Sequence, residues 1–168
     1  MTSVIIPNSV TSIGNLSFAR NQKLTSVTMG DGVISIGNGA FQNCFGLTAI
    51  TIGSSVKNIG EGAFANCSGL KSIIMSDTLE SIGKNAFYAC ATLNSITLPN
   101  TLKTIGDSAF EGCTKLTSII LPNTLESIEN AVFKNCLALT SITLPNTLIN
   151  IGSGAFQNCF GLTSITIP

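Results

Sequence analysis

A repeat of 23 residues runs through the whole chain and constrains its fold more than any other feature of the sequence. The decapeptide GAFQNCFGLT occupies residues 39–48 and returns unchanged at residues 154–163, 115 positions later. Columns of isoleucine, phenylalanine and cysteine, starting at Ile13, Phe18 and Cys44, keep the same spacing without insertion or deletion. One leucine column has seven members: Leu24, Leu47, Leu70, Leu93, Leu116, Leu139 and Leu162. The chain is therefore an array of about seven units plus a final strand.

Each unit carries an apolar stripe that a single copy cannot bury. The consensus is L-T-S-I-T-L-P-N-T-L-x-x-I-G-x-x-A-F-x-N-C-x-x, and its unit positions 1, 4, 6, 10, 13, 17, 18 and 21 are apolar in nearly every copy. Stacked copies can bury the stripe, because each then covers its neighbours with like residues. One inserted residue would misalign all of these columns together. We therefore predict a single solenoid domain over residues 1–168.

The periodicity within the unit predicts its local structure. LTSITLP alternates apolar and polar residues and is rich in β-branched types, which indicates a half-buried strand with unit positions 4 and 6 inward and 3 and 5 toward solvent. A turn rich in Pro, Asn and Gly follows, and LxxIG is expected to form a shorter extended piece on the opposite wall. GAFQNC is expected to make about one helical turn, which would bury unit positions 17, 18 and 21. Strands one circuit apart pair in parallel, so residues 2–6 to residues 163–167 should form one continuous eight-stranded sheet.

Unit position 14 is glycine in nearly every copy. Such a glycine indicates a left-handed turn or a close approach of the backbone. Glu129 is the only departure, and it predicts strain or a shifted turn in its unit.

The pattern L-x-x-I-x-L-P-x-x-L-x-x-I-G-x-x-A-F-x-x-C resembles the BspA-like leucine-rich repeat over essentially the whole chain. The best-matching copies are residues 93–115, LNSITLPNTLKTIGDSAFEGCTK, and residues 139–161, LTSITLPNTLINIGSGAFQNCFG. The resemblance implies an α/β repeat, a right-handed leucine-rich-repeat solenoid with a continuous parallel β-sheet on one face and short helical or 3-10 turns opposite. Members are mostly large surface or secreted proteins of bacteria and protists, linked to adhesion and host-protein binding. The motif has no associated catalytic residue, so none is carried over.

Composition narrows the function. The chain has eight basic and eight acidic residues, and this neutrality argues against a nucleic-acid partner, which needs a basic stripe. No apolar run approaches the ~18 residues of a membrane span. The start, MTSVIIPNSV, lacks the features of a signal peptide, and the end, LTSITIP, stops on a strand without a polar cap. Both ends look cut from a longer array.

An enzyme is not expected, because histidine is absent and therefore no serine or cysteine has a histidine to activate it. Paired carboxylates could act as an acid–base couple, but solvated polar surface explains them better. The pairs are Asp77/Glu80, Asp107/Glu111 and Glu126/Glu129. We predict no cofactor and no catalytic residue.

Six cysteines at one unit position allow two interpretations. Their even number is typical of disulfides in a secreted protein. However, in-register neighbours lie ~4.8 Å apart, whereas a disulfide needs converging Cβ atoms ~3.8 Å apart. We therefore expect buried, reduced thiols that act as small apolar residues. A metal site is disfavoured, since no C-x-x-C pair exists.

Charges alternate in sign along three columns. Like charges stacked in a parallel array would repel, so we interpret these columns as ion-pair ladders between turns; random scatter of few charges is the alternative. The columns are Lys57, Glu80, Lys103 and Glu126 at unit position 11; Glu61, Lys84 and Asp107 at position 15; and Glu111 and Lys134 at position 19.

The outward side of the sheet is the predicted partner-binding surface. It is small, neutral and hydroxyl-rich, and it lacks the Trp, Tyr and Arg anchors that concentrate binding energy, which favours weak or multivalent binding. Its predicted contact residues are Ile5, Thr28, Thr51, Ile74, Thr97, Ile120, Thr143, Ser72, Ser95 and Ser118. Phe45 and Phe160 are further candidates for exposed aromatic residues.

Two classes of function stay open at this point. The first is a protein-interaction or adhesion module of a cell-surface or secreted protein, with a host or extracellular-matrix protein as its partner. The second is a structural or engineered repeat scaffold without a specific ligand. Open ends would expose apolar area and strand edges, so we also expect self-association into a homo-oligomer.

Overall fold

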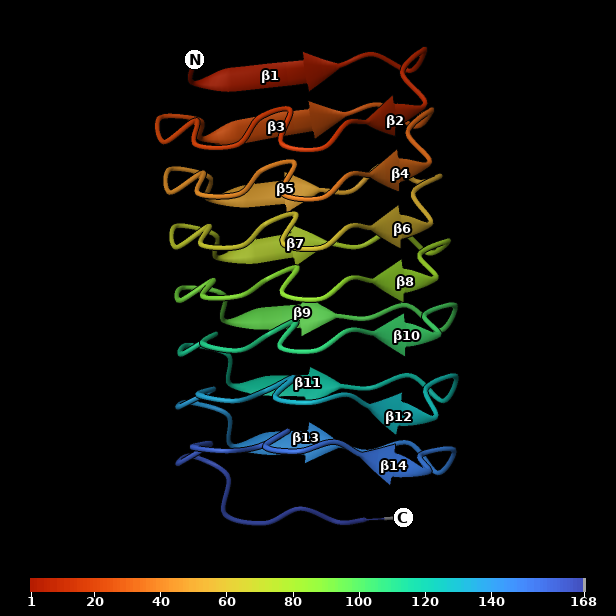
Figure 1. Ribbon diagram of the computed structural model, residues 1–168, viewed down its shortest axis with the longest axis vertical. Coiled ribbons are helices and arrows are strands. Elements are labelled where there is room, and N and C mark those ends of the chain that lie inside the picture. Colours follow the sequence, from red (N-terminus) through yellow and green to blue (C-terminus); the bar gives the residue numbers. More distant parts are fainter. Residues whose placement is uncertain (168) are drawn as a thin grey trace.

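The computed structural model describes residues 1–167 as a parallel β-solenoid, whose successive turns stack along one axis (Figure 1). Each turn gives one strand to a long-strand face and one to a short-strand face. The long-strand face holds β1 (Ser3–Ile6), β3 (Ser26–Met29), β5 (Ala49–Thr51), β7 (Ser72–Ile74), β9 (Ser95–Thr97), β11 (Ser118–Ile120) and β13 (Ser141–Thr143). The short-strand face holds β2 (Ser12–Ile13), β4 (Ser35–Ile36), β6 (Asn58–Ile59), β8 (Ser81–Ile82), β10 (Thr104–Ile105), β12 (Ser127–Ile128) and β14 (Asn150–Ile151).

The predicted parallel pairing and its 23-residue register are confirmed. Ser3 pairs with Ser26 and Val4 with Val27, and every other strand pair keeps the same offset. The register places like residues of successive turns directly over one another. The LxxIG segment forms the short-strand face, as predicted. The right-handed winding stays a prediction. Pro168, the last residue of the predicted domain, lies outside the described residues.

The predicted continuous sheet of eight strands is wrong. The long-strand face divides into β1-β3-β5-β7 and β9-β11-β13, and residues 163–167 form no strand. Ile165 and Ile167 of this segment are exposed. Between β7 and β9, Pro99 stands where Gly30 donates its N–H to Ile6 in an earlier turn. Proline has no such donor. Pro122 nevertheless leaves β9 and β11 paired, so the missing donor of Pro99 does not by itself explain the break.

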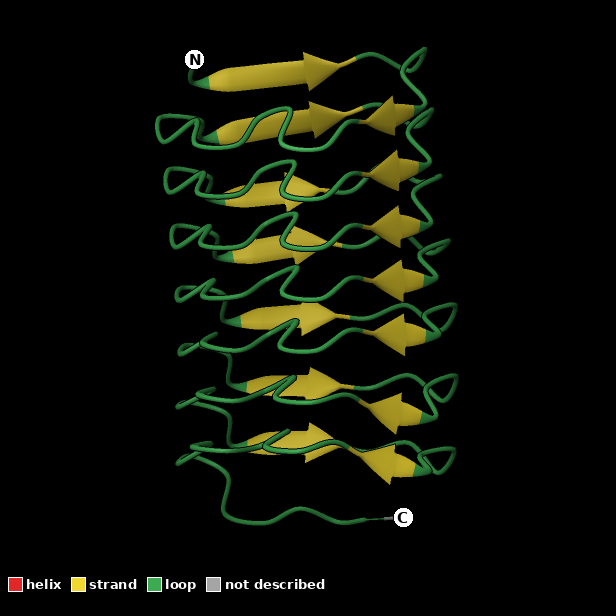
Figure 2. Ribbon diagram, in the orientation of Figure 1, coloured by secondary structure: helices red, strands yellow, loops and turns green. Residues whose placement is uncertain are grey.

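The short helical turn predicted for GAFQNC is also wrong, since residues 1–167 contain only strands, turns and irregular segments (Figure 2). Unit positions 16 and 20 have positive φ in every turn, between 54° and 76°. A right-handed helix cannot pass through left-handed residues four positions apart. Four of these residues are glycine and five are asparagine, the types that tolerate this conformation best. They are Leu16, Arg20, Gly39, Asn43, Gly62, Asn66, Asn85, Ala89, Ser108, Gly112, Ala131, Asn135, Gly154 and Asn158.

The alternating backbone of this segment redirects its hydrogen bonds from one turn of the solenoid to the next. The N–H groups of Gly39 and Phe41 donate to Glu61 and Ala63 of the following turn, at 2.8 and 2.7 Å. The intervening N–H groups donate back three residues, as Gln42 does to Gly39. We call this third side of the solenoid the turn face. Its N–H groups are satisfied alternately by the next turn and by residues three positions back, which is why no helix is needed there.

The core is one hydrophobic cluster that runs the length of the solenoid. Ala40, Phe41 and Cys44 are fully buried, so the predicted inward direction of unit positions 17, 18 and 21 is confirmed although the helix is absent. The phenylalanine rings form one stack from Phe18 to Phe156, with ring centroids 5.2–5.8 Å apart and planes within 10°. This stack passes both breaks in the sheets without interruption.

The break in the short-strand face coincides with Glu129, where the sequence predicted strain. A Cβ added to Gly106 would lie 2.6 Å from the backbone nitrogen of Lys84 in the turn before. Glu129 is the residue of the next turn at the same unit position as Gly106, and its Cβ is directed toward Asp107, which corresponds to Lys84. The sheet separates there into β2-β4-β6-β8-β10 and β12-β14, and the ring stack widens from 5.3 to 5.8 Å. Glycine at unit position 14 therefore permits the close approach at which the short strands pair.

We predict that Glu129→Gly stabilises the protein by about 1 kcal/mol. It would allow two backbone hydrogen bonds of about 0.5–1.5 kcal/mol each, from Glu126 to Lys103 and from residue 129 to Ile105, offset by about 0.5–1 kcal/mol of glycine entropy. Glu129→Ala is the matched control, because it also loses the carboxylate but keeps the Cβ. Urea unfolding should rank Gly above Ala; equal stability of the two variants would contradict this explanation.

Candidate interaction surface

The structure places all ten predicted contact residues on the solvent side of the long-strand face, and all ten are exposed. Ile5, Thr28, Thr51 and Ile74 lie side by side in one column across β1, β3, β5 and β7. The division between β7 and β9 separates this group from a second, shorter column. That second column holds Thr97, Ile120 and Thr143.

The outward side chains of the long-strand face are uncharged, and most of them are serine or threonine. Ser72, Ser95 and Ser118 line a parallel column of hydroxyls, and small side chains leave the neighbouring isoleucines standing above them. Ile5, Ile74 and Ile120 are 75, 63 and 70% exposed. Three isolated apolar side chains on a hydroxyl surface are the strongest contacts that this face offers to a partner.

Charge pairing between turns is present in two of the three predicted columns. The Nζ of Lys103 lies 2.7 Å from Oε2 of Glu80, and that of Lys134 lies 3.3 Å from Oε1 of Glu111. The hydrogen bond from Lys103 lowers the pKa of the Glu80 carboxyl. Over residues 1–167 no other pair approaches within 4 Å, so the column of Glu61 has none. Exposed pairs of this kind contribute only ~0.2–1 kcal/mol.

The cysteines form a ladder of buried thiols, and their predicted burial is confirmed. Each Sγ donates to the carbonyl oxygen of the phenylalanine in the previous turn, at 3.1–3.3 Å, as Cys90 does to Phe64. Burial raises the pKa of Cys67 and of Cys113 to about 12. Because thiolate is the reactive form, burial of this kind disfavours reaction of these thiols, which pack as part of the core.

The described residues contain no group of three potential metal ligands. The three carboxylate pairs named from the sequence stay scattered over different columns of the surface. Phe45 and Phe160 are exposed, at 43 and 78%, beside the turn face. None of the described residues belongs to a helix long and apolar enough to cross a lipid bilayer.

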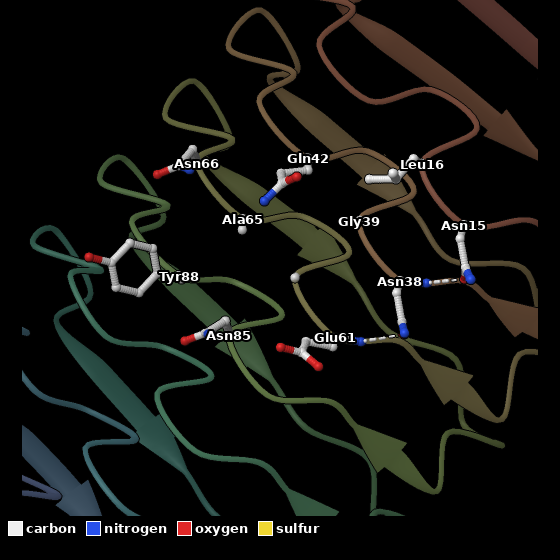
Figure 3. Close-up of a pocket in the computed structure, with 11 residues that line it drawn as sticks. Asn15, Leu16, Asn38, Gly39, Gln42, Glu61, Ala65, Asn66, Asn85 and Tyr88 are labelled. Atoms are coloured by element: carbon white, nitrogen blue, oxygen red, sulfur yellow. Dashed lines mark hydrogen bonds between the residues drawn. The ribbon is translucent and has the colours of Figure 1, made fainter.

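A groove on the turn face was missed at the level of sequence (Figure 3). Its volume is about 460 Å³, and it crosses several successive turns in the N-terminal half of the solenoid. It lies where unit positions 15, 16, 19 and 20 of different turns meet, a juxtaposition that no single unit reveals. The groove is lined by Asn15, Leu16, Asn38, Gly39, Gln42, Glu61, Gly62, Ala65, Asn66, Asn85 and Tyr88.

A parallel β-solenoid with a leucine column, a phenylalanine stack and one repeat per turn defines a leucine-rich-repeat protein. The family model of the BspA type leucine rich repeat region matches residues 1–116 and 80–168, in six copies. The chain therefore belongs to the BspA-type leucine-rich-repeat family.

Solved bacterial structures have the same fold. A leucine-rich repeat protein of T. pallidum superposes with a TM-score of 0.93 at 29% identity, over 96% of this chain and 78% of that one. One from Eubacterium ventriosum has a TM-score of 0.87 at 29% identity, over 100% of this chain and 45% of that one. A leucine rich cell surface protein of Faecalibacterium prausnitzii has a TM-score of 0.60 at 27% identity, over 96% and 59%. This chain thus spans less than two thirds of the second and third proteins. No curated protein matches it.

Proposed function

We propose that the chain is a protein-interaction module of a cell-surface or secreted leucine-rich-repeat protein, and that its long-strand face contacts the partner. The observation that carries the proposal is the row of exposed, in-register side chains on this face. A repetitive face of this kind can contact an extended partner over a large area. The surface location is supported by family membership and by the similarity to a leucine rich cell surface protein.

The chemistry of the face favours a partner that binds weakly and at several places. Burying an exposed isoleucine contributes about 1.5–3 kcal/mol at most, and Ile5, Ile74 and Ile120 are separated by turns that carry threonine. The neutral hydroxyl surface between them adds hydrogen bonds but no anchor. Affinity would therefore come from several turns acting together. An extracellular-matrix or host protein with an extended, repetitive segment fits this surface.

The test is binding to an array of immobilised extracellular-matrix proteins. The double variant Ser72→Lys, Ser118→Lys adds two long, positively charged side chains to the long-strand face. The two positions are two turns apart, so the added charges do not repel each other directly. Binding should fall at least tenfold. The matched control, Ser68→Lys with Ser153→Lys, adds the same charge to exposed positions away from the face and should bind as the unchanged protein does.

Equal loss in both double variants would contradict a role of the long-strand face. Absence of binding to every matrix protein would leave the alternative, a structural or engineered scaffold without a specific ligand. Self-association through the ends of the solenoid stays a prediction, and sedimentation at several concentrations measures it.

A further inference from the structure

The groove on the turn face arises because three small residues form its floor. Ala65 lies between the larger side chains of Gln42 and Tyr88, which project from the turns before and after it (Figure 3), and Gly39 and Gly62 also line the groove. In these turns unit position 19 is occupied in order by Gln42, Ala65 and Tyr88. The groove lies over the small residue, Ala65. Its volume of about 460 Å³ falls within the range of small-molecule sites, about 300–1,000 Å³.

The floor of the groove cannot recognise a peptide by adding a strand. The N–H of Gly39 donates to Glu61, and that of Gly62 donates to Lys84, both at 2.8 Å. Addition of a strand needs unpaired backbone donors and acceptors, and these N–H donors are already used between turns. Recognition in the groove therefore depends on side chains.

The side chains of the groove present a dense set of neutral hydrogen-bonding groups. Oδ1 of Asn38 accepts from the N–H of Glu61 at 2.9 Å, which fixes the orientation of the Asn38 amide and leaves its NH₂ available. Across residues 1–167, the side chains of Gln42, Asn66 and Asn85 make no hydrogen bond to the rest of the chain. An amide offers two donors and an acceptor with two lone pairs.

The charge and shape of the lining restrict the ligand further. Glu61 is the only charged residue among the lining residues, so an anionic ligand is disfavoured. Its carboxylate can accept hydrogen bonds at two oxygens. Tyr88, partly exposed at one side of the groove (Figure 3), offers an aromatic face to the apolar face of a ring. The side-chain amides pair donors with acceptors, Glu61 supplies one carboxylate, and Tyr88 supplies an aromatic face. Together these groups match a ligand that carries adjacent hydroxyl groups.

We propose that this groove binds a segment of a neutral oligosaccharide. The amides of Asn38, Gln42 and Asn85 pair with hydroxyl groups, Glu61 accepts from two adjacent hydroxyls, and a sugar ring rests on Tyr88. The site is independent of the long-strand face, since it lies on a different side of each turn. The oligosaccharide proposal can therefore be tested independently of the proposed protein-interaction role.

The test titrates the full chain with the neutral trisaccharides maltotriose, cellotriose and mannotriose, followed by two-dimensional ¹⁵N NMR. At least one probe should saturably shift the amide signals of Gln42, Gly62 and Tyr88. Glu61→Gln, at an exposed position, should weaken that binding about tenfold, because a neutral amide replaces the double acceptor. Ala65→Tyr fills the floor with a residue that the repeat already holds at the same unit position, in Tyr88, and should abolish the shifts.

Gln157→Tyr is the matched control, since it places tyrosine at unit position 19 of a distant turn and should leave the affinity unchanged. The proposal is overturned if no trisaccharide shifts these signals at millimolar concentration, or if both tyrosine variants weaken binding equally. Spermidine serves as a cationic probe. Shifts in the groove with spermidine and none with the sugars would overturn the proposal in favour of a cation site on Glu61.

Discussion

Raising the pH from about 9 to about 11 is expected to unfold this protein through its buried thiols. The pKa of Cys67 and of Cys113 is raised from 9.0 to about 12 by burial, and burial also raises that of Cys90 and Cys136. Between pH 9 and 12 the unfolded thiols lose their protons while the native ones keep them. The native state then binds more protons, so stability falls as the pH rises.

The expected size of this effect is large because the ladder repeats it. Each such thiol contributes a slope of about 1.4 kcal/mol per pH unit once its unfolded form is ionised. Four deeply buried thiols together approach about 5.6 kcal/mol per pH unit, against a typical total stability of about 5–15 kcal/mol. Below pH 9 the thiols are protonated in both states, and their contribution to the pH dependence vanishes.

Urea unfolding followed by circular dichroism at pH 8, 9, 10 and 11 measures the slope. Replacing Cys67, Cys90, Cys113 and Cys136 by serine retains a donor to the phenylalanine carbonyl and should remove most of the alkaline loss. The double variant Cys44→Ser, Cys159→Ser changes the first and last thiols of the ladder, leaves the four central thiols in place and should retain most of it. All lysines and the tyrosine are present in every variant, so the comparison isolates the thiols. An unchanged slope in the fourfold variant would refute the explanation.

Phe87→Ala is expected to lower the free energy of unfolding by about 3–5 kcal/mol, the cost typical of deleting a buried aromatic side chain. The ring of Phe87 is fully buried and lies between Phe64 and Phe110, with centroids 5.3 Å from each. Its loss removes two stacking contacts and leaves a cavity at the centre of the solenoid. In a repeat protein each turn contacts only its neighbours, so the defect also weakens the coupling between the two halves.

Position along the stack provides the control for this prediction. Phe156→Ala makes the same change in the last turn, where the ring is only partly buried and has one stacked neighbour, Phe133. Its cost should be less than half that of Phe87→Ala in urea unfolding. Phe87→Leu, which fills most of the space, should cost much less than the alanine variant. Equal costs at the centre and the end would show that stacking between turns does not couple the repeats.

Much of this architecture could be predicted from the spacing of residues alone. The recurrence of Leu24, Phe18 and Ile13 every 23 residues requires a stack in strict register, and the register requires parallel pairing. Burial of the cysteine column was predicted correctly, but from a helical spacing that the structure does not have. The register and the outward direction of Thr28 and Ser26 followed directly, because a strand alternates its two faces. These properties depend on the period and on local alternation, which a linear sequence displays directly.

The candidate interaction surfaces could be predicted from the sequence only in part. The exposed residues of the long-strand face were predicted from alternation within one unit. The groove between Gln42 and Tyr88 was not, because it depends on the sizes of residues from four columns and several turns. The small residues Gly62 and Ala65 next to large neighbours were the available signal, but only the stacked structure brings them together.

The sequence by itself determined a solenoid, its register and the composition of its core, because a period without slips permits only one way of burying identical columns. Only the tertiary structure decided the form of the turn face and the continuity of the sheets. The glycine and asparagine residues at unit positions 16 and 20 adopt left-handed conformations since their N–H groups find acceptors in the next turn. The short strands part at Glu129, where one Cβ meets the backbone of the neighbouring turn. Both outcomes depend on contacts between residues 22 or 23 positions apart, which local propensity does not contain.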